Sequence, residues 1–211
     1  MERSAVILAG GSSSRFGREK ALVRLAGKPL ICHVFEKVAD IVDEVIVVAS
    51  SDGQKKRIKR LSLGSRVKFA IDDYASHSPL VGASRGFENS SGEYTLLLPC
   101  DTPFLSTEIL LLLMELCVNR DAAVPRWPND YIEPLQAVYR TRAALAASKK
   151  ALNEGRMDMR SMIGNLKRVR YVSTIVLREI DPELRTFFNV NTPADLKTAE
   201  LMLEKEQLTF T

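Results

Sequence analysis

Three short segments of this chain are apolar along their whole length, and they constrain the fold more than any other feature: residues 6–9, 45–48 and 94–98. A strand of this kind is covered on both faces, which is typical of a parallel sheet. Segments with a helical period follow them, at residues 29–41, 53–61, 79–89 and, capped by Ser106, up to Leu116. This alternation predicts an α/β fold of three layers, with helices on both faces of a mostly parallel, doubly wound sheet.

One region departs from this pattern. Two short apolar segments, 122–124 and 136–139, flank a polar, proline-rich loop, which predicts a small antiparallel subregion. A last helix is expected to begin at Thr192 and Pro193. Because no repeat or linker divides the chain, residues 1–211 are expected to form a single domain.

The composition excludes several classes of protein. The longest apolar runs, such as residues 109–114, are far shorter than the roughly 20 residues of a membrane helix, and no secretion signal is evident, so we expect a cytoplasmic protein without a membrane partner. Cys32, Cys100 and Cys117 lie far apart, which argues against disulfides or a zinc site. The net charge is +4, but the densest basic run, residues 55–60, lacks aromatic residues for stacking bases, so no nucleic-acid partner is expected.

The first apolar strand leads into a turn rich in glycine and serine, Gly10-Gly11-Ser12, and the segment then becomes basic with Arg15 and Lys20. Glycine lets the backbone approach an anion closely, successive N–H groups bind it, and the two cations add full charges. The segment is neither a Walker A motif nor a G-x-G-x-x-G motif. It predicts binding of a nucleoside triphosphate, and the alternative is a flexible turn between a strand and a helix.

A single carboxylate, Asp101, follows the third apolar strand. Ligands of open α/β sheets bind beyond the carboxyl ends of the strands, at the edge that also carries the glycine turn. An aspartate beside phosphates most often holds Mg²⁺, which needs only one or two protein carboxylates. Cys100 as a nucleophile is the less favoured reading, because no pattern places His33 or His77 beside it.

Four motifs stand in order between residue 5 and about residue 200, nearly the whole chain. They are L-A-G-G followed by Arg15, Gly17 and Lys20, then P-L-V-G at 79–82, P-C-D-T-P-F at 99–104 and N-V-N-T-P at 189–193. The first is shared by many nucleotidyltransferases, whereas the combination is narrower. In this combination the chain resembles the molybdenum cofactor guanylyltransferases, which have a glycosyltransferase-A-like fold.

The resemblance implies transfer of GMP from GTP to molybdopterin, with release of pyrophosphate and with Mg²⁺ as cofactor. It implies nucleotide contacts and catalytic roles for a set of residues at the carboxyl edge of the sheet: Leu8, Ala9, Gly10, Gly11, Ser12, Arg15, Lys20, Ser50, Asp72, Pro79, Gly82 and Asp101. Lys20 would contact the phosphates, with Arg15 as a second cation, and Asp101 would hold the metal. Asp73 is an alternative to Asp72. Ser50 stands where the family often has asparagine, and Ser78 where it has glycine.

The second substrate is expected to bind the second half of the chain, from about residue 106 to 211, while residues 1 to about 105 bind the nucleotide. Three polar loops are left for it, 129–136, 155–160 and 189–191. Arg156 and Arg160 are four residues apart and are expected to share one helix face, toward the acceptor or toward solvent. Asn191 is a candidate for a second metal contact.

Two alternatives stay open. The first is another nucleotidyltransferase, such as a molybdopterin cytidylyltransferase, a cobinamide-phosphate guanylyltransferase or a sugar-phosphate nucleotidyltransferase. Gly10 argues for guanine, because the cytidylyl relatives generally resemble L-A-A-G at this place and a second glycine leaves more room. The second alternative is a regulatory binder without turnover, which the presence of Arg15, Lys20 and Asp101 argues against. Cofactor-donor or molybdoenzyme partner proteins are expected, and both a monomer and a homo-oligomer remain possible.

Overall fold

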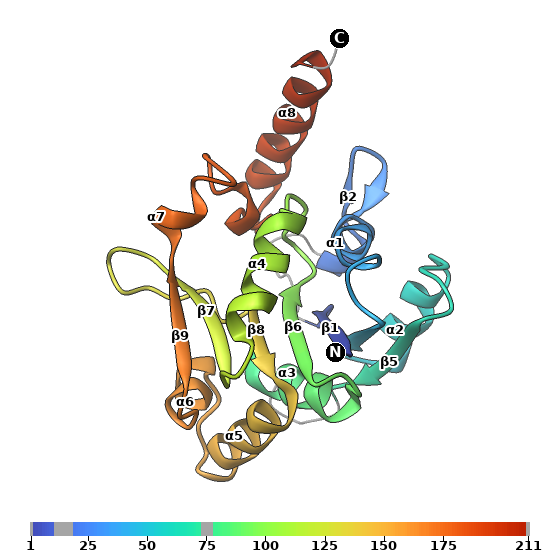
Figure 1. Ribbon diagram of the computed structural model, residues 1–211. Helices are drawn as coiled ribbons and strands as arrows, with labels where there is room; N and C mark the ends of the chain where they lie inside the picture. The colour runs from blue at the N-terminus through green and yellow to red at the C-terminus, as the bar shows by residue number, and fades with distance from the viewer. Residues whose placement is uncertain (1, 11–18, 73–77, 210–211) are drawn as a thin grey trace.

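The computed structural model describes residues 2–10, 19–72 and 78–209. These residues form a seven-stranded sheet in the order β5-β4-β1-β6-β8-β7-β9 (Figure 1). The strands, in that order, are Val67–Ile71, Glu44–Ala49, Arg3–Leu8, Tyr94–Pro99, Ala137–Arg140, Ala122–Arg126 and Val169–Ser173. The first four are parallel, β8 is antiparallel to β6 and β7, and β9 is parallel to β7. The predicted α/β fold with an antiparallel subregion is therefore confirmed.

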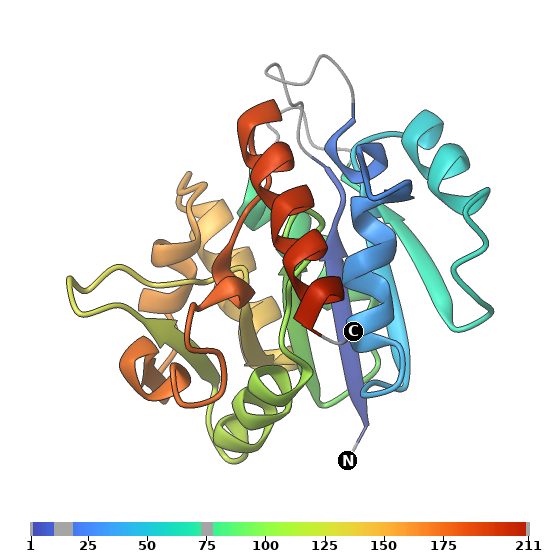
Figure 2. The ribbon, with the colours of Figure 1, turned by 90° about the horizontal axis from the view of Figure 1, so that it is seen from above.

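Helices cover both faces of this sheet (Figures 1 and 2). One face packs against α1 (Leu30–Val38), α2 (Asp52–Lys59), α4 (Thr107–Cys117) and α7 (Thr174–Leu177). The other packs against α3 (Pro79–Asn89), α5 (Thr141–Asn153) and α6 (Met159–Gly164). A hairpin of β2 (Arg24–Leu25) and β3 (Lys28–Pro29) packs against α8 (Pro193–Thr209), which projects from the body of the molecule (Figure 1). No helix of the described residues is long and apolar enough to cross a bilayer.

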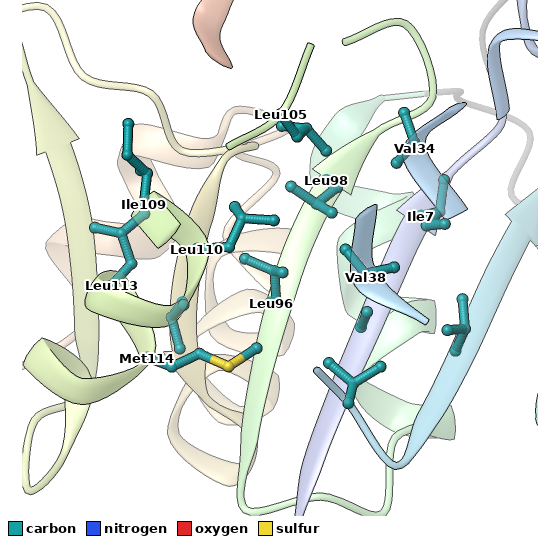
Figure 3. Close-up of a cluster of buried hydrophobic side chains, with 14 of the residues drawn as sticks. Ile7, Val34, Val38, Leu96, Leu98, Leu105, Ile109, Leu110, Leu113 and Met114 are labelled. Carbon is teal, nitrogen blue, oxygen red and sulfur yellow. The ribbon is translucent and has the colours of Figure 1, made fainter. Parts of the chain in front are cut away.

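Successive residues of the central strands feed opposite layers of the core. Ile7 of β1 points into the cluster with Leu96 and Leu98 of β6, where α1 and α4 close over it (Figure 3). Val6 and Leu8 belong to the cluster on the opposite face, under α3. Both layers are apolar because alternate side chains of a strand point to opposite faces, so the continuous apolar runs in the sequence follow from burial on both sides.

The element boundaries differ from the sequence prediction in instructive places. The helix predicted at 79–89 is confirmed as α3, but α1 is shorter than 29–41, because Pro29 pairs in β3 before the helix begins at Leu30. Strand β5, with the sequence Val-Lys-Phe-Ala-Ile, had no continuous apolar run to mark it. Strand β5 lies at one edge of the sheet, where some of its side chains are partly exposed. Strand β9 lies at the opposite edge and also lacks a continuous apolar run, so the sequence pattern did not predict it.

Two glycines of α3 let this helix lie directly on the central strands. A Cβ added at Gly86 would overlap the methyl groups of Val6, and one at Gly82 would lie 3.3 Å from Leu8 Cδ2. Gly82 was expected to serve the nucleotide, and in the structure it is buried against Leu8 of β1. In the structure, Gly82 lets α3 pack closely against β1.

We predict that Gly86→Ala destabilises the protein by about 1–3 kcal/mol, because the added methyl group has no room beside the stiff Val6 side chain. The measurement is urea unfolding followed by circular dichroism. Gly164→Ala is the matched control: it is also helical, and a Cβ there would meet nothing within 4 Å. Equal midpoints for Gly86→Ala and Gly164→Ala would contradict the proposed close packing.

Candidate nucleotide-binding site

Four parallel strands deliver the predicted polar residues to one edge of the sheet. Gly10 follows β1, Ser50 follows β4, Asp72 follows β5 and Asp101 follows β6. Hydrogen bonds continue the strand pairing into this edge, since the Gly10 N–H donates to the Val48 carbonyl at 3.2 Å. The structure therefore brings to one edge residues that lie up to 91 positions apart in the sequence, from 10 to 101.

Lys20 is the centre of the charged part of the site. Its ammonium donates to Asp101 Oδ2 and to Asn191 Oδ1, at 2.7 Å each. Lys20 begins the short helical turn Lys20–Leu22, and Asn191 lies just before α8. The side chains of Lys20 and Asp101 are 21% and 10% exposed, so their ion pair is only partly screened by water. Two predicted residues thus meet, and Asn191 joins them.

The Asp101 carboxylate is built to receive a further positive group. Its Oδ1 atom is buried and has no hydrogen-bond partner among the described residues, while Lys20 holds Oδ2. Its backbone carbonyl accepts from Val190 N–H at 2.9 Å, which fixes the residue against the segment before α8. A buried carboxylate oxygen without a partner is costly. A bound cation would remove that cost.

Gln54 organises the turn after β1 and β4, and the sequence analysis missed it. It is 1% exposed; its Oε1 accepts from Ser50 N–H at 2.8 Å, and its Nε2 donates to the Ala9 carbonyl at 3.0 Å. Ser51 caps α2 by accepting from Gln54 N–H. A glutamine three residues after a serine cap was the available signal. The side chain ties Ser50 to the strand end that carries Gly10.

The remaining predicted residues are placed as follows. Asp72 is 6% exposed, and Leu8 is buried under α3. Pro79 is exposed at the first turn of α3, where the Ser78 hydroxyl accepts from Val81 N–H at 3.3 Å. The serine that replaces the family's glycine therefore caps this helix. Gly11, Ser12 and Arg15 lie outside the described residues, as do Gly17, Asp73 and His77.

Cys100 lies next to Asp101 but is not suited to nucleophilic chemistry. It is 4% exposed. Burial, followed by the neighbouring Asp101 charge, raises the pKa of its thiol well above the ordinary value. A thiol attacks only as the thiolate. Burial and the raised thiol pKa therefore argue against Cys100 as a nucleophile.

On the acceptor side, one prediction is wrong. Arg156 and Arg160 do not share a helix face, because α6 begins only at Met159, after Asp158 caps it by accepting from Ser161 N–H. Arg156 instead lies near Glu154. The prediction assumed one helix through both arginines, but Asp158 caps the start of α6, so Arg156 lies in the turn before the helix.

Two of the three acceptor loops nevertheless meet. The Arg160 guanidinium lies 5.9 Å from the centre of the Tyr131 ring, which joins loops 129–136 and 155–160. In the third loop, Asn189 donates to the Phe187 carbonyl, whereas Asn191 reaches Lys20.

Gly10, Lys20 and a buried carboxylate at the carboxyl edge of a doubly wound sheet are typical of a nucleotide-binding α/β protein. Comparison with known proteins specifies which kind. Residues 5–169 match the model of the MobA-like NTP transferase domain, and the chain belongs to this family.

Its relatives and solved neighbours agree. The chain is 36% identical over 201 residues to a probable molybdenum cofactor guanylyltransferase of Methanosarcina acetivorans, covering 93% of this chain and 89% of the relative. It is 33% identical over 203 residues to the molybdenum cofactor guanylyltransferase of Desulfosudis oleivorans, covering 95% and 96%. The crystal structure of molybdopterin-guanine dinucleotide biosynthesis protein A from Archaeoglobus fulgidus superposes with a TM-score of 0.79 at 30% identity, covering 96% and 99%.

We predict that Gln54→Leu destabilises the protein by about 1–3 kcal/mol and weakens GTP binding, because Ala9 and Ser50 each lose a buried hydrogen-bond partner beside Gly10. Unfolding and GTP titration measure the two effects separately. Gln54→Glu still accepts from Ser50 but places a buried carboxylate oxygen against the Ala9 carbonyl, so at neutral pH it should destabilise the protein at least as much as Gln54→Leu. Unchanged GTP affinity in both variants would confine Gln54 to stability.

Proposed function

We propose that this protein transfers GMP from GTP to molybdopterin, forming the guanine dinucleotide form of the cofactor and releasing pyrophosphate. The observation that carries the proposal is the contact of Lys20 with both Asp101 and Asn191, at the edge that also presents Gly10, in a member of the MobA-like family. The relatives' names supply the two substrates.

The reaction needs positioning and charge rather than proton transfer. An oxygen of the molybdopterin phosphate attacks the α-phosphorus of GTP, the bond from that phosphorus to the bridging oxygen breaks, and pyrophosphate leaves with the electron pair. Because the attacking group is already an anion, no general base is required. We assign Lys20 to binding the phosphates and stabilising the charge on the departing pyrophosphate, with Arg15 as a second cation, and the contact of Lys20 with Asp101 supports the assignment.

Asp101 suits a magnesium ion. Among the described residues no cluster of three or more His, Cys, Asp or Glu side chains could hold a metal by itself. Mg²⁺ needs only one or two protein carboxylates when substrate phosphates complete its coordination, and Asp101 Oδ1 is a buried oxygen without a hydrogen-bond partner among the described residues. Bound there, the ion would supply positive charge against the triphosphate. Asn191, beside Lys20, is the candidate for a further contact.

We assign the nucleotide to residues 1 to about 105 of a single domain and molybdopterin to the remainder. One backbone hydrogen bond supports this assignment, since the Val190 N–H donates to the Asp101 carbonyl at 2.9 Å and so joins loop 189–191 to the carboxylate proposed to hold the metal. Within the second half, Gln136 at the end of loop 129–136 donates to the Thr186 carbonyl at 2.7 Å. A cytoplasmic location, where GTP is available, completes the proposal, together with partner proteins that deliver or receive the cofactor.

The direct test is pyrophosphate release from the purified protein with Mg²⁺ and molybdopterin, supplied in turn with GTP, CTP and ATP. Release with GTP that depends on molybdopterin supports the proposal. Release with CTP in preference to GTP would favour the cytidylyl alternative. GTP binding without release in the presence of molybdopterin would favour the regulatory binder.

We predict that Asp101→Asn preserves the fold and lowers kcat about a hundredfold or more, because the amide has the same shape but lacks the charge that would hold Mg²⁺. Steady-state rates over a Mg²⁺ series provide the measurement. Asp40→Asn, on the exposed turn after α1, is the control for a lost carboxylate and should keep the wild-type rate. A near-normal kcat of Asp101→Asn at saturating Mg²⁺ would exclude the metal role.

Gly10→Ala should shift base choice. Gly10 does not have a positive φ, and an added Cβ would lie 3.6 Å from Ser50 Cβ, an ordinary contact, so the turn tolerates alanine. If the methyl group crowds guanine more than cytosine, the ratio of kcat/KM for GTP over CTP falls about tenfold, within the 1–3 kcal/mol expected for one methyl group. An unchanged ratio would show that Gly10 serves the turn or the phosphates rather than the base.

A further inference from the structure

The exposed apolar side chains of this protein are concentrated at one end of the molecule. Of the eight large hydrophobic residues that are exposed among the described residues, six lie between positions 131 and 180: Tyr131, Met157, Tyr171, Ile175, Val176 and Ile180. Ile175 and Val176 of α7 are 59% and 58% exposed. Neighbouring apolar residues that remain in water and are rimmed by polar ones mark an interaction surface.

Arginines extend this apolar region. The Arg126 guanidinium lies 5.1 Å from the centre of the Tyr171 ring, and Arg160 lies over Tyr131. The backbone of Arg126 also forms an isolated antiparallel β-bridge with Ile132, so the end of β7 lies beside the loop that carries Tyr131. Tyrosine and arginine are the residues that most often dominate the energetics of protein interfaces. None of these four side chains contacts the Lys20 cluster.

Strand β9 forms the edge beneath this region (Figure 1). It pairs with β7 on one side, and no described strand pairs with its other side. An edge strand presents unpaired N–H and C=O groups that can accept a strand from another chain. Because β9 runs in the direction of β7 and β6, its carboxyl end and α7 lie at the same edge of the sheet as Asp101.

The net positive charge of this surface indicates which kind of partner it can bind. From Met157 to Ile180 the chain carries five cations, Arg160, Lys167, Arg168, Arg170 and Arg178, against two carboxylates, Asp158, which caps α6, and Glu179. Arg168 is paired with Asp121, whereas Lys167, Arg170 and Arg178 form no ion pair with the described residues. A second copy of this chain would set these cations against one another. Complementarity therefore requires an acidic partner.

We propose that β9 and α7 form a docking surface for an acidic, extended segment of another protein, which adds as a strand to β9. Arg170 and Tyr171 lie on opposite faces of β9, so the carboxylates of the segment meet Arg170 on one face and its apolar side chains cover Tyr171 on the other. Beyond the strand, the segment reaches Lys167 at one end and Ile175, Val176 and Arg178 at the other. The partner then sits at the edge of the sheet where the reaction takes place, beside the acceptor half. The surface shares no residue with the nucleotide site, so its role is independent of which nucleotide the protein uses.

The test uses the full chain and a fluorescein-labelled ten-residue peptide of alternating valine and glutamate, with a peptide of alternating valine and lysine as the reference. Fluorescence anisotropy measures affinity, and amide hydrogen exchange shows where the peptide binds. We expect binding of the glutamate peptide, weakening as salt rises, and slower exchange in β9. Arg170→Glu should weaken binding about tenfold or more, and Ile175→Ser with Val176→Ser should also weaken it.

Arg142→Glu is the matched control, because it makes the same charge change at the exposed start of α5, which lies at the amino end of β6, the end of the sheet away from Asp101 and α7. It should leave peptide affinity unchanged, and both charge variants should keep wild-type pyrophosphate release. The proposal is overturned if the lysine peptide binds equally well, if Arg142→Glu weakens binding as much as Arg170→Glu, or if β9 exchange is unaffected. A dimer in sedimentation that Arg170→Glu dissociates would also overturn it, since the surface would then be occupied by a second copy.

Discussion

The parallel pairing of β1 between β4 and β6 is the constraint on which the rest of this structure depends. Parallel strands end at the same edge, so three chain segments that pass through the sheet must present their following residues together. The pairing in turn requires helices on both faces, because both faces of these strands are apolar. The glycines of α3 that lie against Val6 and Leu8 belong to the same requirement, since they bring the helix close enough to exclude water.

The charged centre of the site is a second, more local constraint. Lys20 joins partners that are 81 and 171 positions away in the sequence, which ties the first turn, the end of β6 and the start of α8 into one unit. The same point receives the Val190 to Asp101 backbone bond. A nucleotide bound at Lys20, as proposed, would therefore also contact the unit that includes the segment before α8.

The part of the sheet beyond β7 differs from the part near β6 in how far its side chains are buried. Toward β6 the polar groups are paired and buried, as Gln136 shows, whereas beyond β7 the aromatic and basic groups face water. A chain that only needed to hold small substrates would gain nothing from exposed Ile175 and Val176. A surface for a macromolecular partner at this end accounts for their exposure without altering the chemistry at Asp101.

The sequence alone determined the fold class and the order of the central elements, and it singled out Gly10, Lys20 and Asp101, which the structure brings to one edge of the sheet. Buried strands must be apolar throughout, and phosphate binding needs glycine and cations, so both are visible without coordinates. The edge strands β5 and β9 were not visible, because partial exposure removes the pattern. Only the tertiary structure decided that Asn191 meets Lys20, that Gln54 bridges Ser50 and Ala9, and that Asp158 separates Arg156 from α6. These contacts join positions whose spacing in the chain carries no information about distance, or depend on where a helix begins, and both are set by packing.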